Sequence, residues 1–280
     1  MEEAIFKNGS TTYYWSSRFF PKSIREDVFR FYSFVRVVDD YVDQSKPDVK
    51  ALNELRGRWR TAQASPNFST DSLAKDSKND RVIKNIVYIV RKYSCSPEWV
   101  EAFFASMEMD VKCRKYNNLS DTLEYIYGSA EVIGLFMARI MSLPETAYEA
   151  AKMQGRAMQF VNFIRDVDED NHLGRQYFPA DLLRVFGLEN LSKSEAKKKP
   201  EQFAQFMNEQ IRLYRQWQEQ ANTGFVFIPR RLRVPLRTAV DMYNWTAKQI
   251  EQDPMVVFSR KVKPHKRRVL RTVLKRVFWA

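Results

Sequence analysis

Glycine is scarce in this 280-residue chain, and its eight glycines form neither a G-x-G-x-x-G nor a G-K-[S/T] loop. The usual backbone cradles for nucleotide phosphates are therefore excluded, so any phosphate chemistry must use another device. The chain has two cysteines, Cys95 and Cys113, and two histidines, His172 and His265. These side chains cannot build a spaced zinc site or a Ser-His-Asp triad, and we expect a reduced, cytoplasmic protein.

Long apolar runs are missing as well. Residues Met1–Ala4 are acidic, unlike the start of a signal peptide, and the longest apolar stretch, Ile133–Leu143, is short and contains Arg139. We therefore expect no membrane span.

The net charge of +12 fits nucleic acid, an anionic membrane or a polyanionic small substrate. Nine Lys or Arg gather in Arg260–Arg276 without an aromatic-rich recognition motif, so we expect no nucleic-acid binding.

Apolar residues recur at helical spacing along most of the chain, and no alternating strand pattern is convincing. The pattern predicts helices over residues 21–44, 48–64, 80–93, 96–114, 119–143, 145–172, 201–223, 229–253 and 262–278. The polar stretches 65–80 and 192–200 are predicted to be surface loops, and neither marks a domain boundary. We expect one all-α domain over residues 1–280.

Asp39 and Asp43 stand four residues apart in an apolar segment. Their side chains share one helix face, and such a like-charge pair destabilises an isolated helix by about 0.2–0.5 kcal/mol. A bound cation would offset that cost. Taken alone, however, a D-x-x-x-D pair is more often a solvated acidic helix end.

A second polar stripe changes that balance, because its members follow one another at steps of three and four residues along an apolar helix. They are Gln159, Asn162, Asp166 and Asp170. Mg²⁺ prefers carboxylate oxygens, waters and substrate phosphates, so two facing Asp pairs could hold several ions that clamp a diphosphate. The predicted metal ligands are Asp39, Asp43, Asn162, Asp166 and Asp170.

Arg36 and Arg165 each lie close to one of the Asp pairs in the sequence. We expect both guanidinium groups to bind diphosphate oxygens bidentately. The alternative is that each Arg only neutralises the carboxylate beside it.

Five segments together resemble the squalene/phytoene synthase family, whose enzymes condense two identical prenyl diphosphates head to head. They are Ser10–Pro21, Phe31–Arg36 running into the first Asp pair, Tyr125–Ala130, Gln159–Asp170 and Gly174–Pro179. The resemblance covers most of the chain and implies an isoprenoid-synthase helical bundle around a central cavity. One departure is Ser129-Ala130-Glu131, where the family commonly has Val-Ala-Gly. The added carboxylate of Glu131 could face the cavity, water or Arg139.

The resemblance also implies a mechanism and residue roles. Metal-assisted loss of one diphosphate leaves an allylic cation, the second chain attacks it to give a cyclopropyl intermediate, and a second ionisation and rearrangement follow. The implied catalytic residues are Asp39, Asp43, Asp166, Asp170, Tyr127, Tyr177 and Tyr243. The implied diphosphate-binding residues are Ser10, Arg36, Gln159, Asn162 and Arg165. The tyrosine rings would stabilise cations by about 0.5–2 kcal/mol each, although core packing explains any one of them equally well.

The product expected from the resemblance is phytoene, made from two geranylgeranyl diphosphates with Mg²⁺, for which Mn²⁺ can substitute. NADPH is not expected, because the chain has no dinucleotide fingerprint. The alternatives are dehydrosqualene or squalene made from farnesyl diphosphate, or a catalytically silent scaffold protein. We expect a monomer.

Two further patterns leave alternatives open. Apolar residues repeat at helical spacing among Lys and Arg in the C-terminal segment 260–280, so this basic helix either lies on anionic lipid at the inner face of a membrane or docks on the core. Ala130, Gly134 and Ala138 form a stripe of small side chains, which either admits a neighbouring helix or lines a tunnel for a prenyl chain.

Overall fold

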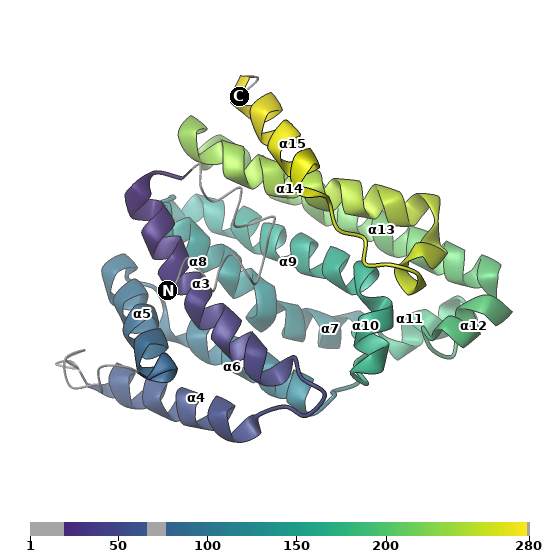
Figure 1. The fold of residues 1–280 in the computed structure, drawn as a ribbon, viewed down its shortest axis with the longest axis horizontal. Coiled ribbons are helices and arrows are strands. Elements are labelled where there is room, and N and C mark those ends of the chain that lie inside the picture. Colours follow the sequence, from purple (N-terminus) through teal and green to yellow (C-terminus); the bar gives the residue numbers. More distant parts are fainter. Residues whose placement is uncertain (1–19, 66–76, 279–280) are drawn as a thin grey trace.

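The computed structural model describes residues 20–65 and 77–278. Every regular element in these two stretches is helical, which confirms the all-α prediction (Figure 1). The α-helices are α3 (Lys22–Val42), α4 (Val49–Ala64), α5 (Lys78–Tyr93), α6 (Pro97–Val111), α7 (Leu119–Ile126), α8 (Val132–Ile140), α9 (Tyr148–Arg165), α10 (Val167–His172), α11 (Ala180–Val185), α12 (Lys193–Lys198), α13 (Pro200–Asn222), α14 (Arg230–Gln252) and α15 (Lys266–Phe278). A π-helix, η2 (Tyr127–Glu131), joins α7 to α8, and short 3₁₀ turns are η3 (Glu145–Ala147), η4 (Thr223–Phe227) and η5 (Pro254–Phe258).

Helix starts follow ordinary capping chemistry. The side chains of Asp48, Ser77 and Asn118 accept backbone N–H groups of the first turns of α4, α5 and α7, each at 3.0 Å. A cap of this kind stabilises a helix by about 1 kcal/mol. These positions agree with the predicted helix starts to within two residues.

Two long helices predicted from periodicity are interrupted. The predicted helix over 119–143 contains the π-helix η2, and the one over 145–172 breaks at Asp166, whose φ of −99° and ψ of 17° separate α9 from α10. Likewise α3 ends at Val42, so Asp43 is its C-cap residue. Apolar spacing does not report such breaks, because the side chains on both sides of each break still reach the core.

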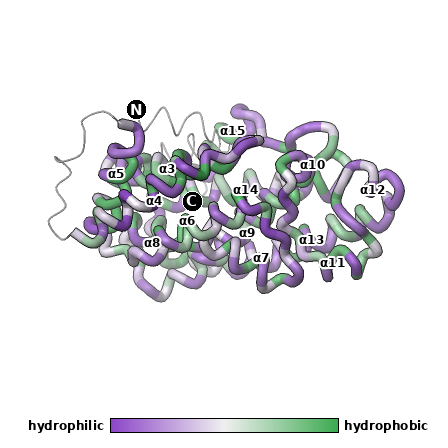
Figure 2. Tube along the Cα trace, turned by 90° about the horizontal axis from the view of Figure 1, so that it is seen from below, coloured by the Kyte–Doolittle hydropathy of each residue, from purple (hydrophilic) through white to green (hydrophobic). Residues whose placement is uncertain are grey.

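The prediction that residues 192–200 form a loop is wrong. Helix α12 spans Lys193–Lys198, and the Ser192 hydroxyl caps it by accepting the Glu195 N–H at 3.2 Å. Its only fully buried apolar side chain is Ala196, so the segment lacks the apolar periodicity that identifies longer helices. This hydrophilic helix lies at the end of the elongated molecule opposite α5 (Figure 2).

Helix α9 crosses the centre of the molecule (Figure 1) and contributes to the larger of two apolar cores. One core joins α9 to α13 through large rings such as Phe160 and Trp217, and the other joins α3, α5, α6 and α8 around Phe34 and Phe104. A third, smaller cluster forms around Phe20 and Phe225. Residues of both larger cores, such as Phe31 and Phe163, line one central cavity, and the polar stripe of α9 lines the same cavity.

The small-residue stripe packs against α9. A Cβ atom added at Gly134 would lie 2.1 Å from the Ala151 carbonyl oxygen, and one added at Gly155 would lie 2.2 Å from the Ala130 carbonyl oxygen. Ala138 is only 1% exposed and does not line the central cavity. Ala130 and Gly134 also line the central cavity, so the stripe packs closely against α9 and two of its three residues border the cavity as well.

Gly134→Ala should destabilise the protein, because its new methyl group meets backbone that cannot rotate away. We expect an overpacking cost of about 1–3 kcal/mol in the free energy of unfolding, measured by urea denaturation. The control is Gly57→Ala in α4, where nothing lies within 4 Å of the new Cβ and alanine's helix propensity should stabilise the chain slightly. Equal stability of the two variants would contradict this account of the α8–α9 contact.

Candidate active site

A cavity of about 1230 Å³ lies between α3, α6, α8, α9 and α14, which is larger than an ordinary small-molecule pocket. One end is charged and the other is apolar. The apolar end contains Phe20, Met141, Phe225 and Ile228, which also form the third apolar cluster. The charged end contains Asp39, and the rise of α3 separates it by about 26 Å from Lys22, the first residue of α3, which follows Phe20 closely in the chain. The cavity can therefore receive a long apolar chain with an anionic head.

The first Asp pair lies at the C-terminal end of α3. Asp43 is fixed by Arg175, whose Nη1 donates to Asp43 Oδ1 at 2.8 Å and whose Nη2 donates to the Val42 carbonyl at 2.6 Å. Within residues 20–65 and 77–278, Asp39 has no comparable partner, and desolvation together with the neighbouring Asp43 raises its pKa well above the ordinary value. The pair thus keeps one carboxylate whose negative charge is poorly compensated.

The second Asp pair flanks the break between α9 and α10. Arg165 binds Asp166 bidentately, with Nε to Oδ1 at 2.9 Å and Nη2 to Oδ2 at 2.5 Å. Burial alone would raise the pKa of Asp166, but the bonds from Arg165 outweigh it and lower the pKa. Asp170 has no such partner among the residues that the structure describes, and burial and the charge of Asp166 raise its pKa to about 8. Each predicted pair therefore contains one compensated and one uncompensated carboxylate.

The predicted ligand Asn162 supplies a test of whether a cation fits. Its Oδ1 is buried in the cavity wall and accepts no hydrogen bond from the described part of the chain, while its Nδ2 donates to Gln159 Oε1 at 3.4 Å. An orphaned amide oxygen beside uncompensated carboxylates suits a hard cation. In the described residues, no three Asp, Glu, His or Cys side chains lie close enough to hold one ion together. Each of several Mg²⁺ ions would be held by one or two protein ligands and would complete its shell with water and phosphate oxygens.

Both predicted arginines line the charged end, and each is paired with an Asp in this structure. Arg36 Nη2 lies 2.7 Å from Asp40 Oδ1, and Arg165 holds Asp166 as described above. The alternative raised from the sequence, neutralisation of a neighbouring carboxylate, thus describes their present contacts. The guanidinium groups still border the cavity, where a diphosphate could compete for them.

Asp110 and Tyr125 are site residues that the sequence reasoning missed. Asp110 is 5% exposed, and its two oxygens accept from Tyr177 Oη at 2.7 Å and Tyr125 Oη at 2.8 Å. Burial raises the pKa of Asp110 to about 6, although nearby Arg175 opposes the shift. The predicted Tyr177 ring stacks on Phe163 with centroids 4.2 Å apart. Asp110 shares α6 with Glu98, Glu101 and Glu108, so the sequence alone did not distinguish it from the other acids of this helix.

The remaining predicted site residues divide into three groups. Tyr243 and Gln159 line the cavity, as do Tyr177 and both Asp pairs. Tyr127 does not line it and is 40% exposed, so the structure does not bring this ring to the reacting space. Ser10 lies outside the described residues.

Glu131, which departs from the family motif, faces none of the three surroundings expected from the sequence, which were the cavity, water and Arg139. Its carboxylate is buried, with a residue exposure of 3%, and accepts from Arg156 Nε at 2.7 Å. Arg156 in turn covers the Trp217 ring at 5.4 Å. The added acid therefore forms a structural ion pair between η2 and α9.

The C-terminal segment closes the charged end. Lys261 contacts Asp166 at 3.5 Å and also pairs with Glu169, while Lys263 and His265 line the cavity beside it. Residues 261–266 thus form a strap beside the charged end. After the strap, α15 docks on α14, with Val269 buried and Arg268 over the Trp245 ring at 4.7 Å. In the described stretches, no helix is long and apolar enough to cross a membrane.

Comparison with known proteins places this geometry in a family. The chain matches the squalene/phytoene synthase family over residues 6–268. A presqualene diphosphate synthase from Rhodopseudomonas palustris is 33% identical over 180 residues, and the match spans 64% of this chain but only 61% of that protein. A 15-cis-phytoene synthase from Pantoea ananas is 27% identical over 258 residues, which cover 87% of this chain and 79% of that protein.

A solved structure agrees at the level of the fold. The crystal structure of a dehydrosqualene synthase in complex with ligand superposes with a TM-score of 0.83, covering 99% of this chain and 94% of that chain at 22% sequence identity. The family match extends over nearly the whole chain, and the acidic segments that carry it line one helical cavity. The protein therefore belongs to the squalene/phytoene synthase family.

Proposed function

We propose that this protein is a prenyltransferase that condenses two geranylgeranyl diphosphates head to head to give phytoene. The observation that carries the proposal is the polarity of the cavity. Both acidic segments and at least three cationic side chains border one end, and the other end is apolar. This division suits a substrate with a diphosphate head and a long hydrocarbon tail.

The charged end would bind and orient the diphosphates. Arg36, Arg165 and Lys261 supply donors there, and each would exchange part of its present carboxylate contact for phosphate oxygens. Mg²⁺ held by Asp39, Asp170 and Asn162, together with their partners Asp43 and Asp166, would stabilise the leaving diphosphate as a Lewis acid. The acidic side chains alone would repel that anion, so metal dependence follows from the same charges.

The middle of the cavity would protect the cation formed when diphosphate leaves. Tyr177 is held by its bond to Asp110, so its ring is fixed in the wall, and Phe163 and Tyr243 border the same space. Aromatic ring faces stabilise a desolvated cation by about 0.5–2 kcal/mol each. Apolar walls also keep out the water that would quench the cation.

The choice of phytoene rests on the relatives and on composition. Named phytoene synthases match 87% of this chain, and the sequence has no dinucleotide fingerprint to supply hydride from NADPH. The presqualene diphosphate synthase, at 33% identity, favours the alternative in which farnesyl diphosphate is the substrate.

We also propose that the enzyme works as a monomer in the cytoplasm, at the inner face of the membrane. The supporting observation is exposed apolar surface beside basic residues. Leu270 and Leu274 on α15 are 56% and 50% exposed, and Val226 in η4 is 72% exposed. A hydrocarbon product needs such contact with lipid to leave the enzyme.

Asp39→Asn and Asp170→Asn should each reduce turnover by at least about 100-fold, because each removes an uncompensated ligand while keeping the side-chain shape. Neither change should lower the melting temperature, since each removes repulsion. Asp168→Asn, in the same acidic run but outside the cavity lining, is the control for charge alone. Near-normal turnover by Asp39→Asn at saturating Mg²⁺ would contradict the proposed metal clamp.

Tyr177→Leu should lower kcat by about 2- to 30-fold, the range that corresponds to one cation–π contact. Tyr177→Phe keeps the ring and should lose less. The matched control is Tyr127→Leu on the exposed face of η2, which should leave kcat unchanged. Steady-state kinetics of the three variants decide whether the ring at position 177 faces the reacting chain.

Product analysis tests the substrate. Purified protein is incubated separately with farnesyl and geranylgeranyl diphosphate, with and without NADPH, and the hydrocarbons are identified by mass spectrometry. We expect phytoene from geranylgeranyl diphosphate and no effect of NADPH. Turnover of farnesyl diphosphate alone would assign the alternative substrate and keep the family chemistry, whereas no product from either substrate would favour the scaffold interpretation.

A further inference from the structure

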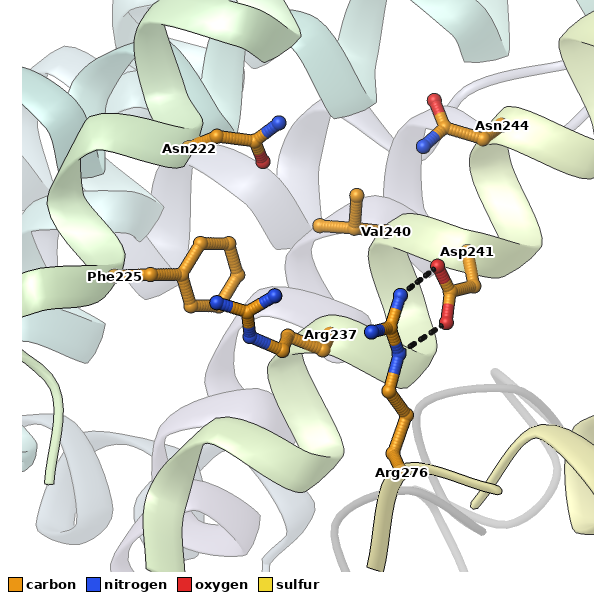
Figure 3. A pocket seen from close by; sticks show the side chains of 7 residues that line it. All are labelled: Asn222, Phe225, Arg237, Val240, Asp241, Asn244 and Arg276. Carbon is orange, nitrogen blue, oxygen red and sulfur yellow. Dashed lines mark hydrogen bonds and ion pairs between the residues drawn. The ribbon is translucent and has the colours of Figure 1, made fainter. Parts of the chain in front are cut away.

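A second, smaller hollow of about 190 Å³ lies apart from the charged end of the cavity, between α13, η4, α14 and α15 (Figure 3). Its polar side chains come from three helices: Asn222 at the end of α13, Arg237, Asp241 and Asn244 on α14, and Arg276 on α15. The proposed reaction uses none of these residues.

The two amide side chains present hydrogen-bond donors to this hollow. Asn244 Oδ1 already accepts from Tyr214 Oη at 2.8 Å, and Asn222 Oδ1 accepts from Gln218 Nε2 at 3.1 Å. Their carbonyl oxygens are therefore occupied, and their Nδ2 groups remain to bind an acceptor.

The two guanidinium groups give the hollow a net positive charge. Arg276 donates to both oxygens of Asp241 through Nε and Nη2, each at 2.7 Å, which leaves its Nη1 unused. Arg237 lies over the Phe225 ring at 4.6 Å and forms no ion pair with any carboxylate in the described part of the chain. Figure 3 shows both guanidinium groups at the same side of the hollow. The hollow therefore contains one carboxylate and two guanidinium groups.

We propose that this hollow is a binding site for a phosphate or diphosphate group. Two planar guanidinium groups match the oxygens of a tetrahedral anion, and the amide N–H groups can bind its remaining oxygens. The anion would also separate two like charges that face the same space. Asp241 does not oppose this role, because Arg276 already neutralises it.

Two sources can supply this chemistry, a free inorganic anion or the headgroup of an anionic lipid. The elements that form the hollow also carry the exposed apolar residues Val226, Leu270 and Leu274, so a lipid headgroup can reach it. Phe225 lines both the hollow and the apolar end of the cavity. An anion bound in the hollow would therefore affect the part of the cavity wall that contacts the end of a prenyl chain.

The test compares the full-length protein with Arg237→Gln and with Arg231→Gln, a control on the same helix that loses the same charge outside the hollow. Inorganic diphosphate is titrated calorimetrically into each protein in metal-free buffer containing EDTA. We expect Arg237→Gln to weaken binding by about tenfold or more, and Arg231→Gln to leave it nearly unchanged. Asn222→Asp, which adds a negative charge without changing shape, should weaken binding to a similar extent and covers the case that Arg237→Gln folds poorly.

A second arm measures flotation with vesicles of phosphatidylcholine alone or with phosphatidic acid. Selective loss of diphosphate binding by Arg237→Gln and Asn222→Asp identifies a site for free anions. Selective loss of phosphatidic acid binding by the same two variants identifies a site for a lipid headgroup. If Arg237→Gln, Asn222→Asp and Arg231→Gln bind diphosphate equally well and also bind phosphatidic acid vesicles equally well, the proposal is wrong.

Discussion

The buried guanidinium of Arg175 is the contact on which the active site depends. It follows α10, yet it binds Asp43 and the Val42 carbonyl at the end of α3, and its Nε lies 3.9 Å from Asp110 on α6. Three segments far apart in the sequence therefore meet at one side chain. Because Arg175 is only 7% exposed, it must remain paired, and a buried charge that loses its partner costs several kcal/mol. The position of the first acidic segment relative to the second is set by this constraint.

At the charged end of the cavity, only some of the carboxylates are paired with a cationic side chain. Asp43 and Asp166 are held by arginines, whereas Asp39 and Asp170 have raised pKa values because burial and a neighbouring carboxylate disfavour their charged forms. The strap formed by residues 261–266 adds cations from the far end of the chain. In the proposed function, a metal ion would bind the carboxylates without a partner, a diphosphate would bind the cations, and the two ligands would offset each other's charge.

Much of this arrangement follows from local sequence, and the rest depends on contacts that local sequence does not contain. The Asp pairs and Asn162 could be predicted because a four-residue step recurs in the sequence, and this step brings the side chains to one cavity even though α3 ends before Asp43 and α9 ends before Asp166. Asp110 and Arg175 could not, since their meeting depends on how α3, α6 and the chain after α10 pack. Tyr125 and Tyr127 illustrate a different limit. Two residues apart on a helix point about 200° apart, so only one of them can face the cavity, and the motif alone does not say which.

The close approach of α8 and α9 has a consequence for how this protein can change over evolutionary time. At Gly134 and Gly155 the two backbones touch with no room for a side chain, so the seam cannot be enlarged or filled by substitution. That wall has a fixed position. Variation in the length or shape of the accepted chain must instead arise on the opposite walls, where α3 and α14 contribute long side chains such as Phe31, Leu236 and Met242 that a single replacement can shorten or extend. One wall of the cavity, at the contact between α8 and α9, is therefore fixed, whereas the wall formed by α3 and α14 can vary.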